Sequence, residues 1–151
     1  MSKENIIKTF EKITDNARYT AESHHIIATR SKMISRFTEL FPAVIASLSS
    51  AAFIQGFIEP WSGLLALISS VIVATSIVIN PNKSYYENLN AAKNFTVIKN
   101  KASRLKSLSS SYSENDLLKK AEKVSEEYEQ LVRLTPPTTD WAYEKAKEKL
   151  G

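Results

Sequence analysis

Residues 40–82 contain a single charged residue, Glu59, in a chain of which 24% of the residues are charged. Glu59 divides the stretch into two uncharged runs, residues 40–58 and 60–82. Each run is close to the ~20 residues that a helix needs to cross the roughly 30 Å hydrocarbon core of a bilayer. Lipid offers no partners to backbone N–H and C=O groups, so a segment crossing it must satisfy them internally, as a helix does. The stretch therefore predicts a hairpin of two transmembrane helices.

Basic residues flank this stretch on both sides. Arg30, Lys32 and Arg36 precede it, Lys83 and Lys93 follow it, and the connector between the two runs carries only Glu59. Loops rich in Lys and Arg stay in the cytoplasm, so this distribution predicts a two-pass topology with both termini cytoplasmic. Basic residues beside a span also suit the anionic inner leaflet of a lipid bilayer, which is the first partner that the sequence predicts.

The flanking segments, 1–39 and 83–151, have helical periodicity, and no alternating strand pattern is present. Apolar residues recur at roughly helical spacing in a segment free of Pro and Gly, namely Ile6, Phe10, Ile13, Ala17, Ile27, Ile34 and Phe37. We expect one long N-terminal helix, with a potential break in the weak stretch 20–25, and we place Pro42 at the start of the first span. The predicted fold is all-α, with an N-terminal cytoplasmic helix (1–39), a transmembrane hairpin (40–82) and C-terminal cytoplasmic helices (83–151).

The C-terminal segment carries a second repeating pattern. The second span should end near Asn80, and a helix should resume after Pro81. Ser113 is expected to cap the next helix, which should end before a non-helical segment at 135–140. Asp140 is expected to cap the last helix, after that segment. Apolar residues then repeat every three or four positions, as in a helix that packs lengthwise on another. These residues form a candidate oligomer seam: Leu89, Phe95, Ile98, Leu105, Leu117, Val124, Tyr128 and Leu131. Neither segment can bury a generous core alone, so the two should pack on each other or on other copies.

Each predicted span carries one stripe of small or weakly polar residues. The candidate residues are Ser47, Ser50, Gln55, Ser62, Ser69, Ser76 and Asn80. One interpretation is close packing between helices, because small residues let backbones approach and hydroxyls bond across the interface. The other is a pore, in which several hairpins form a ring and one stripe of each hairpin faces a water-filled centre. No charged residue lies in the middle of either run, which argues against a proton relay.

Several functional classes find no support in the sequence. The chain has no cysteine, and its only histidines are His24 and His25. Adjacent residues on a helix point about 100° apart, so these two do not form a metal site. His24 lies near the packing seam and is expected in a core or an interface. No acid, base or nucleophile can be assigned, and no aromatic residues interleave with the basic ones as in a nucleic-acid surface. We therefore expect no enzymatic activity, no cofactor and no nucleic-acid partner.

The order of these features resembles the SLATT family, two-transmembrane effectors of bacterial defence and nucleotide-signalling systems. The resemblance rests on four segments: residues 19–25 (YTAESHH) with Arg30, residues 79–86 (INPNKSYY), residues 91–95 (AAKNF) and residues 136–141 (PPTTDW). It implies a homo-oligomeric, pore-forming effector of an anti-phage, CBASS-like system in the bacterial inner membrane. Such an effector permeabilises the membrane when a sensor protein or a nucleotide second messenger triggers it.

Two alternatives remain open at this point. The chain could instead be a non-conducting membrane anchor or scaffold that recruits a cytosolic partner through its helical arms. Both uncharged runs could also be buried helices of a soluble bundle, although they are long for that and the remaining helices provide a thin cover.

Overall fold

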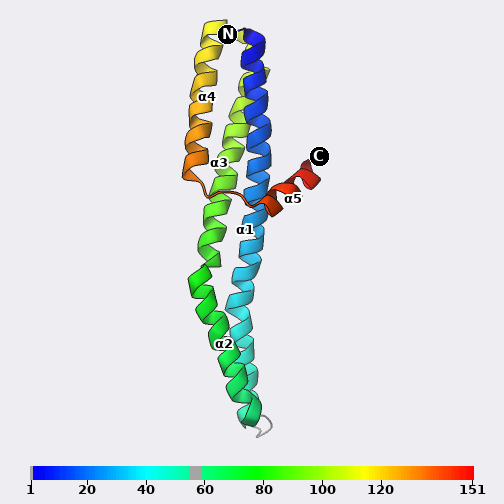
Figure 1. Cartoon of the computed structure of the whole chain (residues 1–151), viewed down its shortest axis with the longest axis vertical. Helices are drawn as coiled ribbons and strands as arrows, with labels where there is room; N and C mark the ends of the chain where they lie inside the picture. Colours follow the sequence, from blue (N-terminus) through cyan, green and yellow to red (C-terminus); the bar gives the residue numbers. More distant parts are fainter. Residues whose placement is uncertain (1, 55–58) are drawn as a thin grey trace. The chain divides into compact units, whose positions relative to one another are not determined.

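The computed structural model describes the backbone of residues 2–54 and 59–151 and the side chains of 2–48 and 63–151. Described residues form five α-helices and one short 3-10 turn: α1 (Lys3–Ile54), α2 (Glu59–Ile79), α3 (Pro81–Ser107), η1 (Ser109–Ser111), α4 (Glu114–Leu134) and α5 (Asp140–Leu150) (Figure 1). No strand occurs in this part of the chain. The prediction of an all-α fold is thus confirmed.

The helices form two compact units. Unit 1 combines Met1–Ala28 with Tyr86–Gly151, and unit 2 is Thr29–Tyr85. The first and last parts of the chain therefore pack on each other, which is one of the two arrangements that the sequence left open. The division differs from the three predicted segments, 1–39, 40–82 and 83–151, because α1 and α3 each contribute to both units.

Unit 1 has a continuous apolar core between α1, α3 and α4, which lie side by side (Figure 1). Its buried residues recur every three to four positions on each helix, which is the stripe that an amphipathic helix presents to a core. They are Ile6, Phe10, Ile13, Ala17 and Ala21 on α1, Phe95, Ile98 and Ala102 on α3, and Leu117, Ala121 and Val124 on α4. The fifth helix, α5, buries only Ala142 and Ala146.

Local chemistry sets the ends of α4 and α5. The Ser113 hydroxyl accepts a hydrogen bond of 3.2 Å from the backbone N–H of Asp116, so the predicted cap of α4 is confirmed. The cap of α5 is Thr139 instead of the predicted Asp140, because the Thr139 hydroxyl accepts from the N–H of Ala142 at 3.4 Å. Asp140 is the first residue of the helix, where its negative charge suits the positive end of the helix dipole.

The first helix is unbroken, which corrects two expectations. The stretch 20–25 is helical throughout, because Ser23 and His24 are buried in unit 1, where His24 packs against Phe95 of α3. Pro42 lies inside this 52-residue helix and not at its start. Proline has no N–H to donate to the carbonyl four residues earlier, so α1 lacks one backbone bond at this point.

The junction between α2 and α3 lies where the sequence placed it. Asn80 has a positive φ of 44°, and its N–H bonds the carbonyl of Ser76 at 2.9 Å. Asparagine tolerates this left-handed conformation better than most residues, and it often ends a helix. The Asn80 side-chain oxygen then accepts from the N–H of Lys83 at 3.1 Å, and Pro81 occupies the first position of α3, where it loses no bond.

Phe95 provides a test of the core of unit 1. Its side chain is 1% exposed, stacks on His24 and meets the ring of Tyr128 edge-on. We expect Phe95→Ala to lower the free energy of unfolding by about 3–5 kcal/mol, because the lost ring leaves a cavity that its neighbours cannot fill. The full chain in detergent micelles would be unfolded with denaturant and followed by circular dichroism.

Val97 supplies the matched control, since it lies on the same helix with 62% of its side chain exposed. Val97→Ala should change the unfolding free energy by less than about 0.5 kcal/mol. Equal effects of the two substitutions would contradict the assignment of the core.

Candidate functional site: the apolar surface of unit 2

Unit 2 exposes large apolar side chains on both of its main helices. On α1 they are Met33, Ile34, Phe37, Leu40, Phe41, Val44 and Leu48, and on α2 they are Leu64, Leu67, Ile68, Val71, Val73, Ile77, Val78 and Ile79. Val78 is 85% exposed and Ile77 is 74% exposed. Contiguous apolar surface of this kind is rare on soluble monomers and marks contact with a membrane or a partner.

One helical run in the described part of the chain, Gly63–Ser107, is long and apolar enough to cross a membrane. None of its apolar window is buried within the structure. The uncharged part of the run lies in α2 and the junction after it, since Lys83 is the first charged residue after Glu59. A core helix of a soluble protein would pass the same test of length and composition but would be mostly buried.

A polar cluster joins α1 to the first turn of α3 within unit 2. The Ser35 hydroxyl lies 2.8 Å from both Glu39 Oε1 and Asn82 Oδ1, and its one proton is shared between these acceptors. The Asn82 amide donates to the same Glu39 oxygen at 2.8 Å. We call these three residues the Asn82 clasp. The bond from Ser35, followed by that from Asn82, lowers the pKa of the Glu39 carboxyl, because both favour the charged form.

A hollow lies beside the clasp, between α1 and α2. Its volume is about 490 Å³, and Glu39 and Pro42 on α1 face Val73, Ser76 and Asn80 on α2 and the junction after it. The structure therefore brings two residues of the predicted polar stripes, Ser76 and Asn80, to one hollow.

The other stripe residues are in varied surroundings. Ser47 is exposed and donates to the carbonyl of Ala43 at 2.8 Å, while Ser69 is half-buried. The Ser69 hydroxyl oxygen is shielded from solvent and has no hydrogen-bond partner among the described atoms. Gln55 and the side chains of Ser50 and Ser62 lie outside the described residues.

The predicted seam residues lie in unit 1. Phe95, Ile98, Leu117 and Val124 are buried in its core, and Leu105, Tyr128 and Leu131 pack against that core. Leu89 is half-buried beside a pocket of about 580 Å³ between α1, α3 and the end of α5. Their spacing thus serves packing within one chain, against the apolar stripe of α1. The sequence analysis found the periodic residues Ile6 to Ala17 of that stripe but did not pair them with the seam.

His24 occupies the buried position that the sequence predicted. Its ring is 1% exposed, lies parallel to Phe95 at 5.7 Å between centroids, and places Nδ1 2.8 Å from Asn88 Oδ1. Burial lowers the pKa of His24, and the bond to Asn88 opposes that shift in part. The neutral ring donates its Nδ1 proton to the Asn88 oxygen, since an amide oxygen can only accept.

Sequence reasoning missed two groups of polar contacts in the structure, the Asn82 clasp and the partner of His24. A signal existed in the spacing, since Ser31 and Ser35 on α1 stand four residues apart, as do Ser84 and Asn88 on α3. Such pairs lie on one helix face. The Ser31 and Ser84 hydroxyls are 3.0 Å apart, so the two polar faces do meet.

No family model matches the chain, and neither does any curated protein or solved structure. In the described part of the chain, no group of three or more His, Asp or Glu side chains is arranged to hold a metal ion. The candidate site is the exposed apolar surface of unit 2, described above.

The pKa of His24 predicts a pH dependence of stability. Because the folded state lowers this pKa, the unfolded chain binds the proton more readily, and stability should fall as the pH drops below about 6.5. Unfolding midpoints of the full chain in denaturant at pH 7.5 and pH 5 would measure the loss.

His24→Gln should flatten this dependence, whereas the adjacent His25→Gln, at an exposed position, should leave it in place. A wild-type chain equally stable at both pH values, or a dependence that persists in His24→Gln, would contradict this role of the buried ring.

Proposed function

We propose that this chain is a membrane effector that inserts through unit 2 and, as a homo-oligomer, permeabilises the bacterial inner membrane during anti-phage defence. The observation that carries the proposal is the apolar surface of unit 2. Among the described side chains, unit 1 buries a continuous apolar core between its helices and exposes seven large apolar ones, whereas unit 2 leaves 15 exposed over two helices. Burial in lipid is worth about 25 cal/mol per Å² of apolar surface removed from water.

Charge supports a two-pass topology in this proposal. Within Thr29–Tyr85 the basic residues are Arg30, Lys32, Arg36 and Lys83, all outside residues 40–82. The one acidic residue inside that stretch is Glu59, at the start of α2. The proposal has residues 40–82 cross the membrane twice, with Glu59 on the outer side and both termini in the cytoplasm.

Permeabilisation requires more than one copy, because two helices cannot enclose a pore. The contacts between copies would come from the surface of unit 2, since the heptad-like residues of α3 and α4 already pack within unit 1. The uncharged stripe residues, such as Ser47 and Ser69, would then line or seal the ring. A constriction of this kind gates by exclusion of water, without charged groups.

The defence role and the trigger rest on the resemblance to the SLATT family. In such systems a sensor protein or a nucleotide second messenger would act on unit 1. The alternative is a non-conducting anchor, in which unit 1 recruits a cytosolic partner and unit 2 only holds the chain at the membrane.

Membrane insertion can be tested with matched arginine substitutions. Val71 on α2 is 57% exposed and Val97 on α3 is 62% exposed. An Arg at the centre of a spanning helix costs about 2.5–3.5 kcal/mol, so Val71→Arg should shift the expressed chain from the carbonate-washed membrane pellet toward the soluble fraction. Val97→Arg should not. A soluble wild-type chain, or equal behaviour of the two variants, would refute the proposed insertion.

Pore formation can be tested separately by dye leakage from liposomes that contain the purified chain at high density. The wild-type chain should release a small dye, and Ser69→Leu should reduce release while the chain stays in the membrane, because a bulky side chain closes a small-residue stripe. Val78→Leu is the control, since Val78 lies on the same helix, is 85% exposed and is replaced by another apolar residue. This substitution should leave dye release unchanged. Stable insertion without leakage at any density would favour the anchor.

A further inference from the structure

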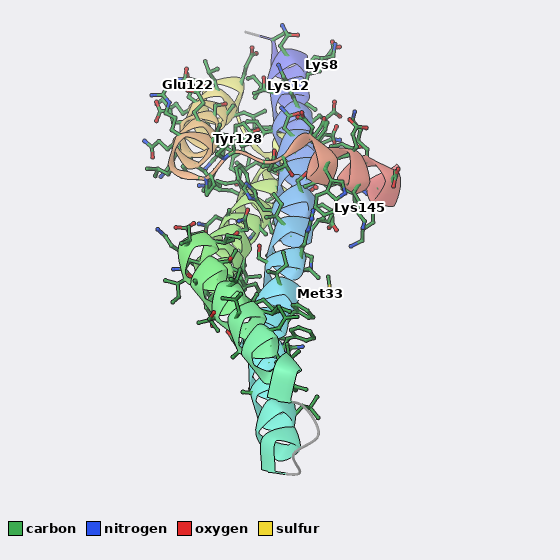
Figure 2. All side chains as sticks on the ribbon, turned by 60° about the horizontal axis from the view of Figure 1, so that its bottom comes forward. Lys8, Lys12, Met33, Glu122, Tyr128 and Lys145 are labelled. Atoms are coloured by element: carbon green, nitrogen blue, oxygen red, sulfur yellow. The ribbon has the colours of Figure 1, made fainter. Side chains whose placement is uncertain are left out.

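The outward face of α1 in unit 2 is apolar over several turns. Met33, Phe37, Leu40, Val44 and Leu48 are 61%, 56%, 65%, 53% and 64% exposed. Figure 2 shows Met33 projecting outward from α1. The opposite face of the same helix carries the buried Ser31 and Ser35, which contact α3, so the two faces have separate roles.

A shallow groove of about 240 Å³ runs along this outward face. Its walls are Phe37, Leu40, Phe41 and Val44, and Arg36 lies at its edge. The rings of Phe37 and Phe41 are stacked with centroids 4.7 Å apart, which fixes the shape of one wall. The groove thus combines an apolar trough with one cation.

Arg36 is exposed, and no hydrogen bond or ion pair with another described residue engages its guanidinium. The nearest acid along α1, Glu39, already accepts bonds from Ser35 and Asn82 in the clasp. A guanidinium presents several donors in a planar fork that matches a phosphate group. The unsatisfied charge at the edge of the groove therefore suits a phosphate.

We propose that this groove is a binding site for one anionic phospholipid. The lipid phosphate binds the Arg36 guanidinium, and an acyl chain lies along Phe37, Leu40, Phe41 and Val44. The site lies at the boundary where the charged part of α1 meets residues 40–82, which is the depth of a headgroup if those residues span the membrane. The inference rests on the proposed insertion of unit 2, and it adds a lipid preference to it.

Charge favours a lipid over a second copy of the chain as the occupant of the groove. A symmetric contact through this face would bring the Arg36 of one copy toward that of its partner, and like charges would repel. An asymmetric contact would need a carboxylate at the same depth. The nearby Glu39 already accepts bonds from Ser35 and Asn82, and Glu59 follows Arg36 by 23 positions at the other end of the predicted hairpin. An anionic lipid supplies the missing negative charge without either problem.

Native mass spectrometry of the full chain, extracted in detergent, tests the proposal. The probes are dioleoyl phosphatidylglycerol, which is anionic, and dioleoyl phosphatidylcholine, which is zwitterionic. The wild-type chain should retain phosphatidylglycerol in preference. Arg36→Gln should lower that retention about tenfold, as expected for loss of a charge-assisted bidentate contact. Arg36→Lys should lower it less, and Arg133→Gln on α4 should have no effect.

Three outcomes would overturn the site. Equal retention by wild type and Arg36→Gln would remove the role of the guanidinium, and equal retention of both lipids would remove the preference for negative charge. The third uses Leu40→Cys, in a chain that has no other cysteine. Complete cross-linking between copies in phosphatidylglycerol vesicles would show that a second copy covers the groove.

If the wild-type chain enters the membrane and Arg36→Gln behaves like it, the lipid site fails and the insertion stands. A chain that never enters the membrane refutes both.

Discussion

The structure depends on one constraint: unit 2 presents two helices whose apolar side chains have no protein to cover them. Val78, Ile77 and Leu40 are 85%, 74% and 65% exposed, and they belong to a set of 15 exposed large apolar side chains among the described residues of α1 and α2. Water disfavours such a surface in proportion to its area, so something else must cover it. The absence of charge over residues 60–82 is the reason for proposing lipid hydrocarbon as that cover.

Unit 1 differs from unit 2 in where its apolar residues lie. Its helices bury apolar stripes against each other and leave charged side chains outside, among them Lys8, Lys12, Glu122 and Lys145 in Figure 2. Such a unit is suited to water. The helix α1 belongs to both units, and its surface changes along its length from one that forms the core of unit 1 to an apolar outer surface in unit 2. The Asn82 clasp holds α1 and α3 together in unit 2 by polar contacts in place of an apolar core.

Local sequence chemistry predicted the helices and several of their ends, because these depend on neighbouring residues. Pro81 after Asn80 and the cap at Ser113 are examples. The continuity of α1 through Pro42 was not predicted, because a proline was expected at the first turn of a helix, where its missing N–H costs nothing. Spacing showed that Phe95 and Val124 face a partner helix, but it did not identify that partner as α1 of the same chain. The clasp joins residues 47 positions apart, a pairing that one sequence does not reveal.

The most direct test of the account is the environment of the middle of α2. A spin label at Val71→Cys, in the full chain reconstituted in liposomes, would report collisions with oxygen, which concentrates in lipid, and with a water-soluble nickel complex. The same label at Val97→Cys reports on unit 1. We predict high oxygen and low nickel collision rates at residue 71 and the reverse at residue 97. High nickel accessibility at residue 71 in a folded, reconstituted chain would contradict it.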